Sequence, residues 1–201
     1  MMAGDHDTSI RLPPECEPAL LERFLKAEAM ALWTVRSAQN QDVPQNVYTF
    51  LRKHEEDEQQ HLAKFEAMIG RHPRERERLP SVPRQWPVLA VQIYGYESLG
   101  LEFARLLCGL RPDLVSILDD EVVHVTFFER EIRRILGGPQ ATQAQQSAVA
   151  WWRKLPKTVN RYLTAKVFDS TREALAEQIL AAVERRFTGA GLLSIGKSEG
   201  K

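Results

Sequence analysis

Two Glu-x-x-His motifs and two further glutamates are the residues whose types and spacing point most directly to chemistry. Residues three apart lie on one face of a helix, so each motif directs a carboxylate and an imidazole to the same point. In chain order the pattern is Glu, Glu-x-x-His, Glu, Glu-x-x-His, which is the ligand set with which a four-helix bundle holds two iron or manganese ions. The six candidate ligands are Glu28, Glu58, His61, Glu97, Glu121 and His124.

The charges of this set favour the same interpretation. Four carboxylates facing one core would repel each other, and an ionised carboxylate buried without a partner is strongly destabilising. Two divalent cations supply four positive charges and balance the four glutamates, while the two imidazoles remain neutral. Oxygen and nitrogen ligands without thiolate suit iron or manganese.

Apolar residues recur at helical spacing on the same stripes as the candidate ligands, and convincing strand alternation is absent. The sequence therefore predicts an all-α fold. Pro44 and Pro112 begin helices, and Gly70 and Gly137 end them. Predicted helices span about 18–37, 44–69, 87–109 and 112–136, with further helices at 141–166 and at 170–187, the last with a Ser170 cap.

The four glutamates also lie at similar distances from the turns of their hairpins. Each lies nine to 14 residues from the turn of its hairpin, or roughly 15–20 Å at ~1.5 Å per residue. Residues 71–86 contain three prolines and are rich in arginine, which is typical of an exposed connection. We expect this segment to be a long crossover between the second and third helices.

Composition narrows the function classes. The chain has 201 residues, with 27 basic and 27 acidic residues, so its formal net charge is zero and no global attraction to nucleic acid or anionic membrane is implied. Cys16 and Cys108 form neither a metal-type pair nor a disulfide framework. No signal peptide or membrane-spanning segment is predicted. We therefore expect a cytoplasmic protein, which could lie peripherally at a membrane.

On the basis of these six residues and their order, the sequence resembles the ferritin-like diiron-carboxylate superfamily over roughly residues 18–136. The resemblance implies an antiparallel four-helix bundle with additional C-terminal helices, two iron ions with manganese as an alternative in one position, and all six candidates as ligands. It also implies that Glu58 and Glu121 bridge the two metals. The implied division is a flexible segment at 1–17, the diiron bundle at 18–138, packed helices at 139–190 and a disordered tail at 191–201.

Short stretches favour the hydroxylase and rubrerythrin-like branch of this superfamily. Only 24 residues separate Glu97 from Glu121, whereas storage ferritins have longer third and fourth helices, and the paired Cys-x-x-Cys motifs of a rubredoxin module are absent. Residues 97–103 are similar to a helix of tRNA-hydroxylating diiron enzymes, and residues 61–87 are laid out as in demethoxyubiquinone hydroxylases. The resemblance thus implies an O2-dependent oxygenase that acts on an organic substrate and receives electrons from a donor. A homodimer is a further option.

Two other classes of function stay open. One is a ferroxidase or rubrerythrin-like protein that handles iron or peroxide, and the other is a metal-free bundle used for protein interaction. A tRNA, lipid or quinone substrate is compatible with the basic, tryptophan-containing segment 151–166, although packing of its tryptophans on the bundle is the favoured interpretation. His54 lies on the same stripe as Glu58 and His61 and could line the pocket or be an additional ligand, although a satisfied core histidine is the favoured interpretation. Asp120 is a candidate for orienting an imidazole.

Overall fold

A computed structural model describes residues 10–73 and 81–194 of the chain. All regular secondary structure in these two ranges is helical, which confirms the predicted all-α class. Three short 3-10 turns, η1 (Pro14–Cys16), η2 (Pro112–Leu114) and η3 (Lys166–Phe168), accompany the α-helices. The α-helices are α1 (Glu17–Ala38), α2 (Gln45–Ile69), α3 (Trp86–Leu110), α4 (Val115–Leu136), α5 (Ala141–Trp152), α6 (Leu155–Tyr162) and α7 (Arg172–Gly189).

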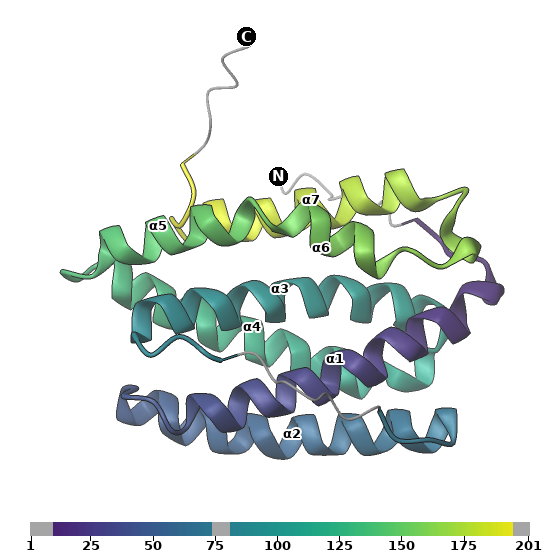
Figure 1. Cartoon of the computed structure of the whole chain (residues 1–201), viewed down its shortest axis with the longest axis horizontal. Coiled ribbons are helices and arrows are strands. Elements are labelled where there is room, and N and C mark those ends of the chain that lie inside the picture. The colour runs from purple at the N-terminus through teal and green to yellow at the C-terminus, as the bar shows by residue number, and fades with distance from the viewer. Residues whose placement is uncertain (1–9, 74–80, 195–201) are drawn as a thin grey trace, which may run out of the picture.

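The first four helices form two hairpins that face each other. α1 packs against α2 and α3 packs against α4, and the hairpins meet through α1 with α3 and through α2 with α4. Helices α2 and α3 run in the same direction (Figure 1). The connection between them must therefore return along the length of the bundle. Residues 74–80 of the predicted crossover lie outside the described residues.

Helices α5, α6 and α7 cover the side of α3 that faces away from α2 (Figure 1). Apolar residues occur all around α3, as is typical of a helix buried on every side. Tyr94 of α3 stacks on Phe187 of α7 with ring centroids 5.3 Å apart. Glu102 of α3 is buried and pairs with Arg186 of α7 at 2.6 Å. These contacts place α7 on the outside of α3.

The residues predicted to begin and end α2 lie at its boundaries. Pro44 caps the start of α2 in an extended conformation, and Gly70 ends it with a φ of 73°. Only glycine adopts this left-handed conformation without steric cost, and its N–H donates to the Glu66 carbonyl. At the fourth helix, Pro112 begins the 3-10 turn η2, and α4 follows it from Val115.

Two details of the C-terminal prediction are wrong. The predicted helix 141–166 is broken between α5 and α6, because Pro156 has no N–H to donate to the carbonyl four residues earlier. The N-cap position of the final helix is Thr171 rather than Ser170, and the Thr171 hydroxyl donates to the Phe168 carbonyl instead of accepting from a helix N–H.

Both ends of the described chain contact the helical body. The Ile10 N–H donates to Gln178 of α7 at 3.1 Å, and Leu12 and Leu192 are buried. The predicted flexibility of residues 1–9 and disorder of residues 195–201 lie outside the described residues. The division into four segments stays a prediction.

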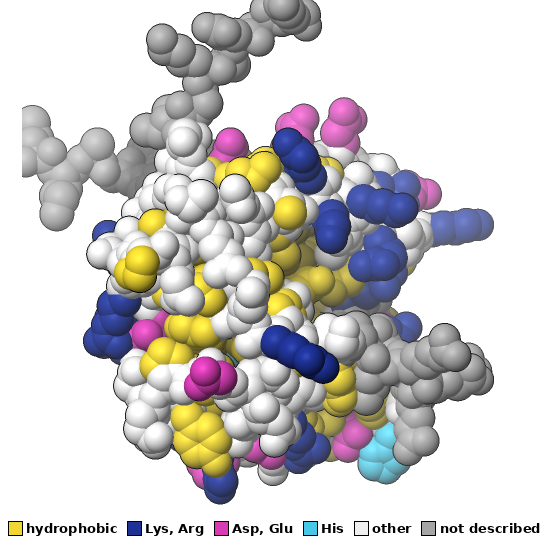
Figure 2. Space-filling view, turned by 60° about the vertical axis from the view of Figure 1, so that its left-hand side comes forward, with side chains coloured by type: hydrophobic (Ala, Val, Ile, Leu, Met, Phe, Trp, Pro, Cys, Tyr) yellow, Lys and Arg dark blue, Asp and Glu magenta, His cyan; other side chains and the backbone are white. Residues whose placement is uncertain are grey.

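The surface carries charges of both signs around apolar areas. On one end of the molecule, hydrophobic side chains gather toward the middle while basic and acidic side chains lie mostly around them (Figure 2). No described helix is long and apolar enough to span a membrane. The cytoplasmic location stays a prediction.

Trp151 packs directly on the backbone of α3. A Cβ added at Gly95 would lie 2.5 Å from the Trp151 indole, which is too close for any real contact. The indole also stacks on Phe187 with ring centroids 5.1 Å apart and meets Tyr96 edge-on at 5.8 Å. These contacts favour packing as the role of this tryptophan, and they support α3 two residues before Glu97.

Gly95→Ala should therefore destabilise the protein. Overpacking of this kind costs about 1–3 kcal/mol, so we expect a lower midpoint in urea unfolding followed by circular dichroism. Gly109→Ala is the matched control, because it lies in the same helix with no atom within 4 Å of its added Cβ. The control should be neutral or slightly stabilising. Equal stability of the two variants would contradict the packing described here.

Candidate metal centre

Two groups of buried ligand side chains converge between the hairpins. One consists of Glu28, Glu58, His61 and Glu121, and the other of His54, Glu58, Glu97 and His124. Within each group the nearest ligand atoms all lie within 4.8 Å of one another. Each group could therefore hold a metal ion.

The structure brings together all six residues that the sequence singled out. Glu28, Glu58 and Glu97 lie near the middle of α1, α2 and α3, while Glu121 and His124 come from the first half of α4. Glu58 belongs to both groups, as a bridging carboxylate would. Glu121 belongs to the first group alone, so its predicted bridging role stays a prediction.

The expectation that His54 is a satisfied core histidine is wrong. It is fully buried, its Nε2 lies 2.9 Å from Glu58 and 3.6 Å from Glu97, and its Nδ1 has no partner. Its ring lies 3.8 Å from that of His124, centroid to centroid. The signal was present in the sequence, because His54 lies one helical turn before Glu58 on the same stripe.

An aspartate from the opposite hairpin holds each of the two predicted histidine ligands. His61 of α2 directs Nδ1 toward Glu28 at 3.6 Å, while its Nε2 lies 3.1 Å from Asp120 of α4. His124 of α4 has the corresponding arrangement with Asp57 of α2. Because one ring nitrogen is taken by the aspartate, the other is left to face the carboxylates.

His124 directs Nδ1 toward Glu97 at 3.6 Å, and its Nε2 lies 3.4 Å from Asp57 of α2. Asp57 and Asp120 directly precede Glu58 and Glu121. An adjacent residue is turned by about 100° on a helix, which here points it at the neighbouring helix. Asp120 was among the predicted positioning residues, whereas Asp57 was not, although the repeated Asp-Glu-x-x-His pattern marks both.

Unpartnered polar atoms show that these side chains fit a metal. Buried polar atoms in proteins nearly always have a hydrogen-bond partner, so a cluster of exceptions needs an explanation. Ligation of cations would satisfy the unpartnered Glu58 oxygen and the Nδ1 atoms of His61 and His124, which face carboxylates of the site. The unpartnered buried atoms at the site are His54 Nδ1, Glu58 Oε2, His61 Nδ1 and His124 Nδ1.

Without cations, the carboxylates favour their protonated forms. Burial raises the pKa of Glu28 to about 8, and the charges of Glu121 and Glu97 act in the same direction against a hydrogen bond with Glu58. Burial also raises the pKa of Glu58 and of Glu121 well above the usual range, and neighbouring carboxylates add to the effect. The protein thus has to protonate these groups or balance them with cations.

The histidines divide into two kinds. Burial lowers the pKa of His54 to about 3, so this imidazole is neutral and able to ligate. Burial alone would lower the pKa of His124 too, but the hydrogen bond to Asp57 and the nearby carboxylates Glu97 and Glu121 raise it to about 11. Burial likewise opposes ionisation of Glu97, but the nearby imidazoles His54 and His124 outweigh it and lower the pKa of this carboxyl.

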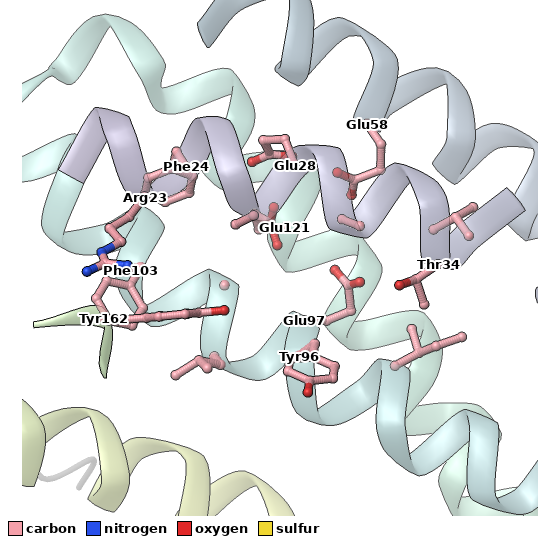
Figure 3. A pocket seen from close by; sticks show the side chains of 16 residues that line it. Arg23, Phe24, Glu28, Thr34, Glu58, Tyr96, Glu97, Phe103, Glu121 and Tyr162 are labelled. Atoms are coloured by element: carbon pink, nitrogen blue, oxygen red, sulfur yellow. The ribbon is translucent and has the colours of Figure 1, made fainter. Parts of the chain in front are cut away.

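A cavity opens onto the carboxylates from between α1 and α3. It encloses about 110 Å³ and is lined mainly by apolar side chains. Glu28, Glu58, Glu97 and Glu121 point into this space, with Arg23 and Tyr162 toward one end and Thr34 toward the other (Figure 3). No histidine lines it among the described residues. A small molecule in the cavity would meet the oxygen ligands directly.

Metal content should follow the membership of the two groups. Glu58→Ala removes the shared carboxylate and should lose both metals, whereas Glu28→Ala should lose one. Metal bound per chain would be measured by inductively coupled plasma mass spectrometry after loading with Fe²⁺ or Mn²⁺ without oxygen. Glu56→Ala, an exposed position on α2, is the control and should keep the wild-type content. Unchanged content in Glu58→Ala would refute the assignment.

The stability of the metal-free protein should fall as the pH rises from 6.5 to 8.5. Glu28 has a raised pKa in the folded state, so its contribution is present in acid and is lost as the pH passes about 8. The raised pKa of His124 acts in the same direction over this range. Added Mn²⁺ should remove most of the fall in Tm, because cations replace the protons. A Tm that rises with pH in the metal-free protein would contradict this electrostatic picture.

Comparison with known proteins gives no match. No protein-family model matches the chain, and neither a curated protein nor a solved structure matches it. The function is therefore inferred from the geometry of the site.

Proposed function

We propose that this protein is an O2-dependent oxidoreductase that holds two iron ions and oxidises an organic substrate. The observation that carries the proposal is the apolar cavity that opens directly onto the four buried glutamates. A site that served only to stabilise the fold would gain nothing from such an opening. The cavity provides a place where a substrate and O2 can reach the metals without bulk water.

The resemblance to the ferritin-like diiron-carboxylate superfamily supports this proposal. Two helical hairpins enclose the site, and the six matching positions converge there together with His54. The first position would be held by Glu28, His61 and Glu121, the second by His54, Glu97 and His124, with Glu58 shared. Manganese in one position is compatible with a ligand set of oxygen and imidazole nitrogen.

In the proposed reaction one atom of O2 enters a C–H bond of the substrate as a hydroxyl group, and the other leaves as water. The balance requires two electrons and two protons, which an external electron-transfer donor supplies. The metals would provide the redox chemistry that activates O2. The chain contributes the rest: carboxylates that adjust as charge changes, imidazoles fixed by Asp57 and Asp120, and an apolar chamber.

Oxygen consumption tests the proposal. The protein loaded with two Fe²⁺ per chain under anaerobic conditions should consume O2 rapidly on mixing, as followed by an oxygen electrode and stopped-flow absorption. Glu97→Ala should abolish this reaction, and Glu56→Ala should leave it intact.

The iron-handling alternative predicts different results. A storage protein would form a large assembly with many irons per chain, which light scattering and metal analysis would detect. A ferroxidase would consume O2 without incorporating oxygen into any organic compound. Either result would replace the oxygenase proposal, and failure to bind iron would favour a metal-free interaction bundle.

A further inference from the structure

The cavity beside the glutamates has a basic residue at one end and apolar walls along its length. We propose that it binds an apolar substrate with an anionic group at one terminus, and that Arg23 recognises this group. The interpretation of this ligand as a substrate rests on the proposed function. Binding itself depends only on the cavity and can be measured without metal or O2.

Small residues on both walls keep the cavity open. Ala27 and Ala31 lie on the α1 wall one helical turn apart, and Gly100 lies on the α3 wall. A Cβ added at Gly100 would lie 3.3 Å from a carboxylate oxygen of Glu121. The space between the helices therefore continues to the metal ligands, and any side chain larger than these would narrow it.

The remaining wall is mainly apolar and aromatic. Phe24 of α1 and Phe103 and Ile93 of α3 contribute large side chains. Such a wall favours hydrocarbon over hydrated polar groups, since burial of apolar surface is the main favourable contribution to binding. The polar exceptions are concentrated at the glutamates and at the cavity ends (Figure 3).

Arg23 is the basic residue among those that line the cavity. Its guanidinium lies 5.8 Å from the centre of the Tyr162 ring, and its Nη2 donates to the Thr164 hydroxyl at 2.7 Å. Among residues 10–73 and 81–194, no carboxylate lies within the 4.0 Å ion-pair distance of this guanidinium. A positioned guanidinium with free donors is suited to two parallel hydrogen bonds with a carboxylate or phosphate.

The separation between Arg23 and the metal ligands limits the length of the substrate. Arg23 precedes Glu28 by five residues on α1, which is ~7.5 Å along the helix axis. The anionic group and the oxidised carbon would therefore lie at least roughly 7.5 Å apart. A straight chain of about eight carbons spans this distance, since each C–C bond advances the chain by roughly 1.3 Å.

Octanoate, octyl phosphate and 1-octanol are the probes that test this inference. Calorimetric titration of the metal-free protein at pH 7 should show that at least one anion binds at least tenfold more tightly than the alcohol. The anion with the higher affinity identifies the head group as carboxylate or phosphate. Equal affinities for all three compounds would overturn the role of Arg23.

Two variants of α1 separate head-group recognition from general effects. Arg23→Gln should weaken binding of the preferred anion at least tenfold and leave octanol binding unchanged. Lys26→Gln removes an exposed positive charge on the same helix and should change neither. Equal weakening by the two variants would show a nonspecific charge effect and would overturn the proposal.

Ala27→Leu tests whether the probes occupy the cavity. The larger side chain should block the anion and octanol alike, while metal content and the circular dichroism spectrum stay as in the wild type. Normal binding by this variant would place the ligand elsewhere and overturn the proposal. Because these titrations require neither iron nor O2, absence of oxygenase activity would refute the proposed function without touching this result.

Discussion

The structure depends on the electrostatic cost of burying four carboxylates in one helical core. Isolated, these charges would be strongly destabilising, because the interior cannot solvate them as water does. This cost raises the pKa values of Glu28, Glu58 and Glu121. Cations would remove it, and the same cations would join residues from α1, α2, α3 and α4. Metal binding would therefore favour the association of the two hairpins.

Most of the site could be predicted from the sequence because its members share helical faces with apolar residues. The spacing of Glu58 and His61, and of Glu121 and His124, is a local property that needs no tertiary information. The all-α class and the boundary at Gly70 follow from equally local rules. These patterns alone identify neither the substrate nor which metal binds.

What the sequence could not provide are contacts between elements. The repeated Asp-Glu-x-x-His pattern places Asp57 and Asp120 beside the candidate ligands, but only the docked hairpins show that each meets an imidazole of the other helix. His54 illustrates the same limit, since its helical face was evident but its unpartnered Nδ1 was not. The break between α5 and α6 was overlooked because apolar periodicity continues across Pro156.

The cavity gives the site two chemically different sides. Carboxylates line the side open to small molecules, whereas none of the three imidazoles of the site lines the cavity. Phe50 instead approaches His54 and His124 with ring centroids about 6 Å apart. A carboxylate can change from one to two bound oxygens with little movement, whereas an imidazole offers one nitrogen in a fixed direction. The carboxylates, whose coordination can change, therefore face the incoming molecule, whereas the imidazoles, whose direction is fixed, do not. Reorganisation during turnover would be confined to the side where the reactants enter.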